Sequence, residues 1–360
     1  MVRAGDTVGV EEEFHVVSPD DGRPVPAARR LLATSRHADA EPELQRTMVE
    51  TATDVHTGLS GLRADLVAKR ASLAAAAGSL GLAVVAAGSV PGAGSHATRV
   101  YPNERYEWMA EEYRQVVVEQ QVCACQVQVG VPDPDLAVRV TRRIRAWLPT
   151  LLAMSVSSPY FAGQDTGYAS YRSIVISRWP TVGPPPDVAS HAEYQSVVAT
   201  LVDSGVISDA GMIYFDARPS SHYPTVEIRV ADAMPMVDDV VLLAALGRAL
   251  VVTAVAEDEA GHPLPEAPQV LLRAATWRAA RSGLGGHLVD PDTRTSVPAE
   301  RRLEALLAHV RPALEERGEW SIVEGLIGAL RARNTSAVRQ RRLSDPAGVV
   351  GALIAETAST

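Results

Sequence analysis

The side chains best suited to chemistry lie on three segments in which polar and apolar residues alternate. In an extended strand, residues two positions apart point to the same face. Each segment therefore presents an apolar face and a second face made of side chains that are good ligands. The second faces carry Glu11 and Glu13, Gln126 and Gln128, and Glu227 and Arg229.

A fourth segment places two carboxylates, Glu43 and Glu50, seven residues apart. If these segments are neighbours, several carboxylates converge, and they cannot all stay ionised unless cations neutralise them. Hard divalent ions prefer such oxygen ligands, and Mg²⁺ typically shares carboxylates with a substrate phosphate. Arg229, on the same face as Glu227, is suited to bind a phosphate or carboxylate through two parallel hydrogen bonds. The pattern predicts phosphoryl chemistry, although each strand taken alone is also compatible with a solvated polar face.

The composition narrows the class of protein. The chain has 360 residues, of which 46% are hydrophobic and 21% charged, as is typical of a globular protein. Its net charge is -9, whereas nucleic-acid binders usually carry an excess of basic residues, so no nucleic-acid partner is expected. Lys69, the single lysine, is expected to be solvated on a charged helix. A phosphate-binding loop that ends in Gly-Lys-Ser/Thr is therefore excluded.

The two cysteines, Cys123 and Cys125, lie two residues apart. On a strand this spacing is too wide for an easy disulfide, and without a second pair it makes no zinc site. We predict buried strand residues in a reducing cytosol. The N-terminal residues carry no apolar segment of a secretory signal, so a cytoplasmic location is expected.

Residues 71–98 contain no Asp, Glu, Lys or Arg, which raises the question of a membrane span. A span needs about 20 strongly apolar residues. This segment is instead rich in Ala, Gly and Ser and is interrupted at Gly78 and Pro91. We predict a helix end, a turn at residues 78–79 and a buried strand over residues 82–87, and no membrane association.

Alternating and helical patterns place the elements that must position these side chains. Strands are predicted over residues 7–17, 82–87, 122–129, 173–177, 212–217 and 224–230. Helices are predicted over residues 25–35, 58–77, 103–120, 132–154 and 189–203, and the chain is mostly helical from about residue 237. The regular βαβ alternation of a doubly wound sheet is absent. We predict one α+β domain over residues 1–360, with a largely antiparallel sheet and helices packed on one face.

Taken in order, short motifs between about residues 7 and 343 resemble the carboxylate–amine ligase family, also described as type 2 glutamate–cysteine ligase-like. The combination is more specific than any one motif. The motifs are Gly9-Val-Glu-Glu-Glu-Phe14, Met48-Val-Glu50, the segment from Ser158 to Ser170, Asp216-Ala-Arg-Pro219, Thr225-Val-Glu-Ile-Arg229 and Arg339-Gln-Arg341.

The resemblance implies a glutamine-synthetase-like fold, in which an antiparallel sheet curves into a funnel with helices on its outer face. It also implies an ATP-dependent ligase that joins a glutamate-like acid to an amine through an acyl-phosphate. ATP and Mg²⁺ are the implied cofactors, small-molecule acids and amines the implied partners, and a homodimer is a further expectation. The implied Mg²⁺ ligands are Glu11, Glu13, Glu50 and Glu227.

The resemblance also implies roles for other side chains. Arg229, with Glu227, would act in catalysis by stabilising the transferring phosphoryl group. Arg172 is a candidate clamp for the substrate's carboxylate, with a surface strand arginine as the alternative. Arg339 and Arg341 are candidates for nucleotide phosphate, with an exposed helix face as the alternative.

The chain departs from the family at its histidines. Where the family usually has Gly-x-His-Val-His-Val-Gly, residues 124–130 read Ala-Cys-Gln-Val-Gln-Val-Gly. The resemblance implies that Gln126 and Gln128 contribute to the substrate pocket. A Gly-Thr-His-Pro-like turn is replaced by Gly88-Ser-Val-Pro91. A neutral amide is a weaker metal ligand than imidazole and cannot act as an acid or base.

Three interpretations remain open from the sequence. The first is a ligase with an altered metal site and a diverged substrate pocket. The second is a repurposed family member without ATP hydrolysis, which acts as an acyl transferase or hydrolase or as a ligand-binding protein. The third is a non-enzymatic scaffold whose polar strand faces point to solvent, and a deep acidic pocket would exclude it.

Overall fold

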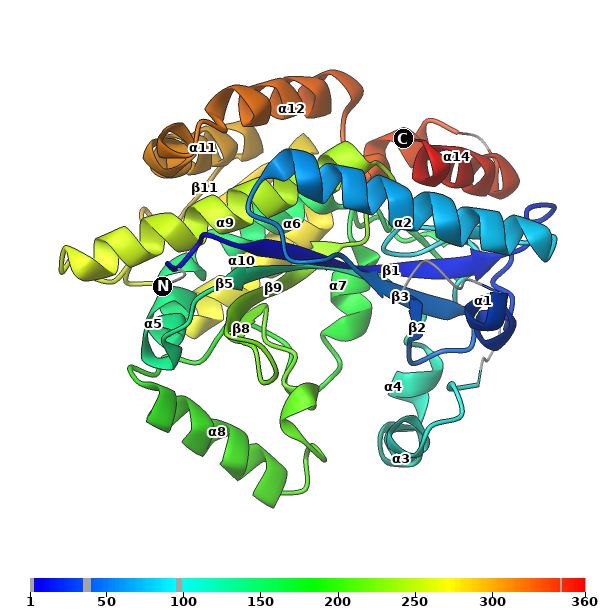
Figure 1. Ribbon diagram of the computed structural model, residues 1–360, viewed down its shortest axis with the longest axis horizontal. Coiled ribbons are helices and arrows are strands. Elements are labelled where there is room, and N and C mark those ends of the chain that lie inside the picture. Colours follow the sequence, from blue (N-terminus) through cyan, green and yellow to red (C-terminus); the bar gives the residue numbers. More distant parts are fainter. Residues whose placement is uncertain (1–2, 35–39, 95–98, 344, 360) are drawn as a thin grey trace.

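The protein is built around a seven-stranded antiparallel sheet (Figure 1). The computed structural model describes residues 3–34, 40–94, 99–343 and 345–359. The strand order is β2-β3-β1-β5-β9-β8, with β4 paired beside β1. These strands are β1 (Val8–Val17), β2 (Ala40–Pro42), β3 (Met48–Ala52), β4 (Ala83–Val85), β5 (Ala124–Gly130), β8 (Ala217–Pro219) and β9 (Thr225–Asp232). The predicted antiparallel α+β architecture is confirmed.

The pairing register brings the polar residues of five strands onto one face. Residues directly opposite each other in an antiparallel pair share a face of the sheet. The opposed pairs are Glu13 with Glu50, Glu11 with Gln126, Gln128 with Glu227, and Arg218 with Glu227. The adjacency of the polar strands, which the sequence could only suggest, is thus established by the register.

The opposite face of the sheet is apolar and carries the main core. Helices α2 (Leu59–Ser79), α5 (Pro134–Ile144), α6 (Leu148–Ser155) and α9 (Val237–Glu259) contribute to it. Val127 and Ile228 of the sheet and Leu246 of α9 are fully buried there. Truncation of one such side chain to Ala typically costs about 2–5 kcal/mol of stability. This packing fixes the orientation of the sheet and so directs its polar side chains to the other face.

Glu12 lies on the apolar side of β1, where a carboxylate needs a partner. Arg70 of α2 donates from its Nε to Glu12 Oε2 at 3.0 Å and from its Nη2 to the carbonyl oxygen of Met234 at 2.7 Å. The solvated position predicted for Lys69 is wrong. Its side chain is buried beside Asp65, with 3.9 Å between its ammonium nitrogen and Asp65 Oδ1. The buried ammonium group therefore has an acidic partner one helical turn away.

The apolar segments belong to the folded protein. α2 ends at Ser79 and β4 is buried at Val84 and Val85, as predicted for that region, whose residues 95–98 lie outside the described part. Helix α9 is long and apolar enough to cross a membrane, but 78% of its most apolar window is buried inside the protein. A core helix of a globular protein has the same composition.

Several predicted elements differ from those observed. The predicted strand over residues 173–177 is helix α7 (Tyr171–Ile176), because Ser170 caps the helix by accepting from the Ser173 N–H. The predicted helix over residues 103–120 breaks at Arg114, where φ is +49°, into α3 (Glu104–Tyr113) and α4 (Gln115–Val118). The helix predicted over residues 132–154 is likewise divided into α5 and α6. In place of a strand over residues 212–217, a 3₁₀ turn precedes β8.

The remaining elements flank this framework (Figure 1). Helices α3 and α4 lie below one end of the sheet and α8 (His191–Asp203) below the other. The predicted helical C-terminal part is confirmed, with one added hairpin, β10 (His287–Asp290) and β11 (Thr295–Pro298). Its helices are α10 (Gln269–Ser282), α11 (Ala299–Glu316), α12 (Trp320–Arg333), α13 (Ser336–Arg341) and α14 (Pro346–Ala358). Short elements α1 (Ala28–Thr34), β6 (Tyr160–Phe161) and β7 (Gln164–Asp165) complete the described fold.

Candidate active site

The polar face of the sheet is the floor of a cavity of about 260 Å³. Side chains from α3 and α7 form part of its walls, among them Tyr106 and Ile176. The carboxylates that line it are Glu11, Glu13, Glu43, Glu50 and Glu227. These side chains face a recessed acidic cavity and not open solvent, so the scaffold interpretation is excluded.

Three of these carboxylates form a tight cluster, which we call the glutamate triad: Glu13, Glu43 and Glu50. One carboxylate oxygen from each lies within 4.8 Å of the others. Glu13 and Glu50 face each other across β1 and β3, and Glu43 follows β2 directly. An all-carboxylate set at this spacing fits a hard divalent cation such as Mg²⁺. The sequence prediction singled out Glu43 as a carboxylate but did not assign it to the metal site, although its spacing from Glu50 was a signal.

The electrostatics of the triad also fit a cation. Burial, reinforced by the charge of Glu43, raises the pKa of Glu13 to about 8. Burial and the charges of neighbouring glutamates raise the pKa of Glu50 well above its ordinary value, and burial raises that of Glu43. Without a cation the triad therefore retains protons near neutral pH. A divalent cation would take the place of these protons.

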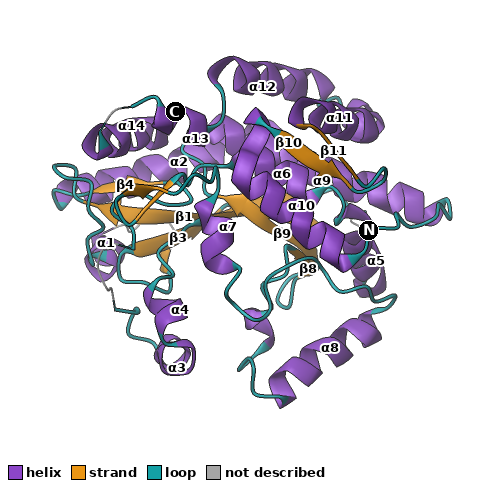
Figure 2. Cartoon of the chain, turned by 180° about the vertical axis from the view of Figure 1, so that it is seen from behind, coloured by secondary structure: helices purple, strands orange, loops and turns teal. Residues whose placement is uncertain are grey.

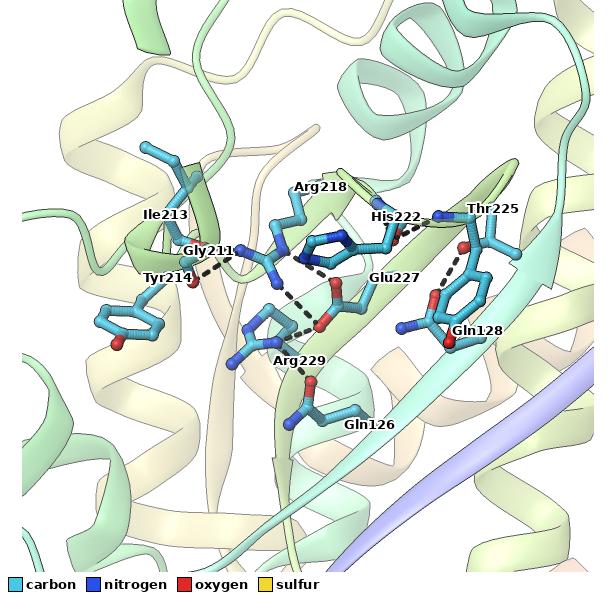
Figure 3. A network of polar contacts seen from close by, with 12 residues as sticks. Gln126, Gln128, Gly211, Ile213, Tyr214, Arg218, His222, Thr225, Glu227 and Arg229 are labelled. Carbon is cyan, nitrogen blue, oxygen red and sulfur yellow. Dashed lines mark hydrogen bonds and ion pairs between the residues drawn. The ribbon is translucent and has the colours of Figure 1, made fainter. Parts of the chain in front are cut away.

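Glu227 has the opposite environment (Figure 3). Arg218 donates from its Nε to Glu227 Oε2 at 2.8 Å and from its Nη1 to the carbonyl oxygen of Ile213 at 2.6 Å. Arg229 pairs with the same carboxylate. Burial alone would raise the pKa of Glu227, but the charges of Arg229 and Arg218 lower it to about 2. Glu227 is thus held as a carboxylate between two guanidinium groups. Arg218 was not among the residues predicted for the site.

Gln126 and Gln128 each use both the carbonyl oxygen and the amide nitrogen of the side chain in hydrogen bonds. Gln126 accepts from Arg229 (Figure 3). It also donates to Glu13 Oε1 at 3.3 Å, so it links the arginine to the triad. Gln128 accepts from Thr225 Oγ1 at 2.6 Å and donates to Glu11 Oε1 at 3.1 Å. Burial and the charge of Glu227 raise the pKa of Glu11. The amide N–H groups therefore orient the carboxylates of Glu13 and Glu11 and stabilise their negative charge.

Arg172 lines the cavity from helix α7, so it is neither on a strand nor on the surface. Its guanidinium donates to the carbonyl oxygens of Val230, at 3.3 Å, and Arg229, at 3.2 Å. It also lies 3.7 Å from the buried Asp232 carboxylate. Arg172 thus fixes the end of β9 that follows Arg229.

Arg339 and Arg341 are not brought to this cavity. Arg339 binds Glu356 through two hydrogen bonds, of 2.9 and 2.8 Å. Arg341 binds Asp165 at 2.6 Å. Neither arginine is among the residues that line the acidic cavity. Their assignment to nucleotide phosphate remains a prediction from the sequence.

Comparison with known sequences gives a consistent result. Residues 7–355 match the model of the glutamate–cysteine ligase family 2. A relative from Frankia alni, named "Putative glutamate–cysteine ligase 2-3", is 48% identical over 335 residues, which cover 93% of this chain and 39% of the relative. A relative from Salinispora arenicola, named "Putative glutamate–cysteine ligase 2", is 44% identical over 94% of this chain and 90% of its own length. The chain thus spans well under half the length of the Frankia relative.

Solved structures agree on the fold. A glutamate–cysteine ligase from Francisella tularensis, in complex with AMP, matches with a TM-score of 0.69 at 11% identity over 100% of this chain and 90% of its own. A bifunctional glutathione synthetase from Pasteurella multocida matches with a TM-score of 0.69 at 16% identity over 98% of this chain and 52% of its own. The predicted glutamine-synthetase-like fold is confirmed. By sequence and by fold, the chain belongs to the glutamate–cysteine ligase family 2.

Proposed function

We propose that this protein is an ATP- and Mg²⁺-dependent ligase that forms an amide from a glutamate-like acid and an amine. One observation carries the proposal. The glutamate triad, with oxygens within 4.8 Å of one another, shares a cavity with the Glu227–Arg229 pair. A cation site and a fixed guanidinium group in one cavity are the groups that phosphoryl transfer needs.

The reaction has two steps. A carboxylate oxygen of the acid takes the γ-phosphoryl group of ATP, which gives an acyl-phosphate and ADP. The amine nitrogen then attacks the acyl carbon and loses a proton, and phosphate leaves. A cation bound by Glu13, Glu43 and Glu50 would supply positive charge to the phosphate oxygens.

The chain's own residues prepare the cavity for this charge. Arg229 is a positioned cation for the phosphoryl group, and such a group typically contributes about 3–4 kcal/mol to the transition state. Glu227 and Gln126 hold its Nη1 from two sides, which limits the reorganisation of the guanidinium during the reaction. Arg218 anchors Glu227 in turn. Arg172 shapes the wall beside them.

The relatives support the ligase assignment through their names, and the Francisella ligase was solved with AMP. Neither the names nor the AMP complex identifies the acid and the amine that this chain uses. The presence of Gln126 and Gln128, where the family usually has histidines, affects which side chains can bind a metal ion. Because Gln128 binds Glu11 and two arginines neutralise Glu227, the glutamate triad is the part of the cavity best suited to a cation.

The same departure favours a second candidate, a family member that no longer hydrolyses ATP. A protein that no longer hydrolyses ATP would be expected to lose imidazole ligands from its metal site. Binding of Mg-ATP separates the two functions. The ligase predicts micromolar binding by calorimetry, and the second candidate predicts none.

Turnover gives the stricter test. The ligase predicts Mg²⁺-dependent ADP release in the presence of acid and amine, and the Glu227→Gln variant should lose at least about 100-fold of this rate. Glu41→Gln is the matched control, because Glu41 is exposed and does not line the cavity. Unchanged ADP release by the Glu227→Gln variant would contradict the assignment.

A further inference from the structure

A second cavity, of about 170 Å³, adjoins the acidic cavity and differs from it in chemistry. Helices α7 and α10, residues 182–184 and the end of β9 enclose it, and Figure 2 shows the two helices beside each other. We call it the apolar pocket. The side chains that give it this character are Ile174, Val182, Pro184, Val230, Trp277 and Ala280.

The apolar pocket contains one carboxylate, that of Asp216. The residue is 9% exposed, and its side chain accepts a long hydrogen bond of 3.4 Å from Thr276 Oγ1 to Asp216 Oδ2. Among the described residues, no ion pair to Asp216 is found. Its backbone is fixed, since its N–H donates to the Gly183 carbonyl at 2.7 Å. The carboxylate is therefore held in place with most of its hydrogen-bonding capacity free.

The arginines around the apolar pocket do not neutralise this carboxylate by contact. Arg229 is engaged with Glu227 and Gln126, and Arg172 with carbonyl oxygens and Asp232. Arg273 lines the pocket as an exposed side chain. A buried carboxylate without a contacting cation has a cationic hydrogen-bond donor as its natural complement.

The apolar pocket and the acidic cavity share a wall, made of Arg172, Ile176, Tyr214 and Arg229. The backbone N–H of Arg229 donates to the carbonyl oxygen of Asp216 at 2.9 Å. A group bound at Asp216 therefore lies beside the residue that we assign to the phosphoryl group. A second substrate in the apolar pocket would thus lie next to the acidic cavity, across the shared wall.

We propose that the apolar pocket binds the acceptor amine, as an apolar primary ammonium ion paired with Asp216. The proposal rests on the proposed ligase function and specifies the class of its amine substrate. The ammonium group offers three donors to the carboxylate, and the hydrocarbon part packs against the apolar walls. Trp277, 45% exposed at the pocket, supplies a ring face that such a ligand would cover. Small polar amines leave these walls in water and are poor ligands.

Calorimetry on the full chain tests this proposal with pentylamine, its neutral counterpart pentanol, and methylamine. Pentylamine should bind at least about tenfold more tightly than pentanol, because a hydrogen bond between charged groups contributes that much. It should also bind at least about tenfold more tightly than methylamine, because its longer hydrocarbon chain buries more apolar surface, at about 0.8 kcal/mol per methylene group. Asp216→Asn should abolish the preference for pentylamine over pentanol. Asp20→Asn, which removes an exposed carboxylate, should leave it unchanged.

A second variant guards against misfolding of the first. Trp277→Ala alters an exposed side chain and should weaken pentylamine binding without changing that of methylamine. Equal binding of pentylamine and pentanol by the wild type, or unchanged pentylamine binding by both variants, would overturn the proposal. ADP release with glutamate and pentylamine is measured separately. The expected binding pattern without ADP release would refute the acceptor role and the ligase function, while the site at Asp216 would stand.

Discussion

Substitution of Glu50 by Gln tests the glutamate triad as a cation site. The change removes one negative charge and keeps the size of the side chain. Without a divalent cation we expect the variant to be more stable than the wild type at pH 8, because it relieves repulsion among the three carboxylates. With Mg²⁺ we expect the order to reverse, because the variant has lost a ligand.

The magnitude follows from the geometry. Two unit charges 4.8 Å apart repel by about 3.5 kcal/mol at an effective dielectric constant of about 20. Protonation already relieves part of this repulsion in the wild type, since the pKa of Glu13 is raised to about 8. We therefore expect a net gain of about 1–2 kcal/mol for Glu50→Gln, or about 1–3 °C in melting temperature for a chain of this length. A cation at 100 times its dissociation constant would stabilise the wild type by about 2.7 kcal/mol.

The assay is thermal unfolding at pH 8 in EDTA and in Mg²⁺. The control variant is Glu41→Gln, because Glu41 is opposite Glu50 in the pairing of β2 and β3 but is exposed. It should behave as the wild type in both buffers. If Glu50→Gln lowered the melting temperature in EDTA and still gained as much from Mg²⁺ as the wild type, the reasoning would be refuted.

Three further predictions use other parts of the structure. Because the pKa of Glu13 is raised from its ordinary value of 4.5 to about 8, the folded state holds a proton there that the unfolded state releases, and the stability that this proton contributes is lost as pH rises through 8. Mg²⁺ then competes with fewer protons, so the gain in melting temperature from Mg²⁺ should grow between about pH 6 and 9. A gain that is independent of pH would contradict this prediction. Gln128→Leu removes the amide donor of Glu11 and should cost about 1–3 kcal/mol in urea unfolding, whereas an unchanged midpoint would show that the hydrogen bond is dispensable. Arg341→Gln should leave ADP release within about twofold and cost at most about 1 kcal/mol, because this partly exposed arginine pairs with Asp165 outside the cavity; a strong rise in KM for ATP would instead support its predicted role at the nucleotide.

The sheet and its polar face could be predicted from the sequence because both depend on a period of two. The alternation in residues 7–17 and 224–230 assigns side chains to faces without knowledge of the partner strands. The register then had to place the carboxylates together, since a shift by one residue would have moved them to the core side. Glu12, the residue that broke the apolar pattern, has a partner in Arg70, which lies far away in the sequence.

Other features depend on contacts that alternation does not encode. Residues 173–177 contain β-branched side chains that favour a strand, but the cap at Ser170 makes them helical and directs Arg172 inward. Glu43 follows a strand of three residues, too short to give a pattern. The position of Arg218 opposite Glu227 is set by the pairing of β8 with β9, and β8 is also only three residues long.

The most direct measurement is an anomalous difference map from crystals of the full chain grown with Mn²⁺ in place of Mg²⁺. We predict a peak among the carboxylate oxygens of Glu13, Glu43 and Glu50, and none in crystals of the Glu50→Gln variant. Wild-type crystals without a peak at this place, or with the three side chains turned away from one another, would contradict the existence of the cation site.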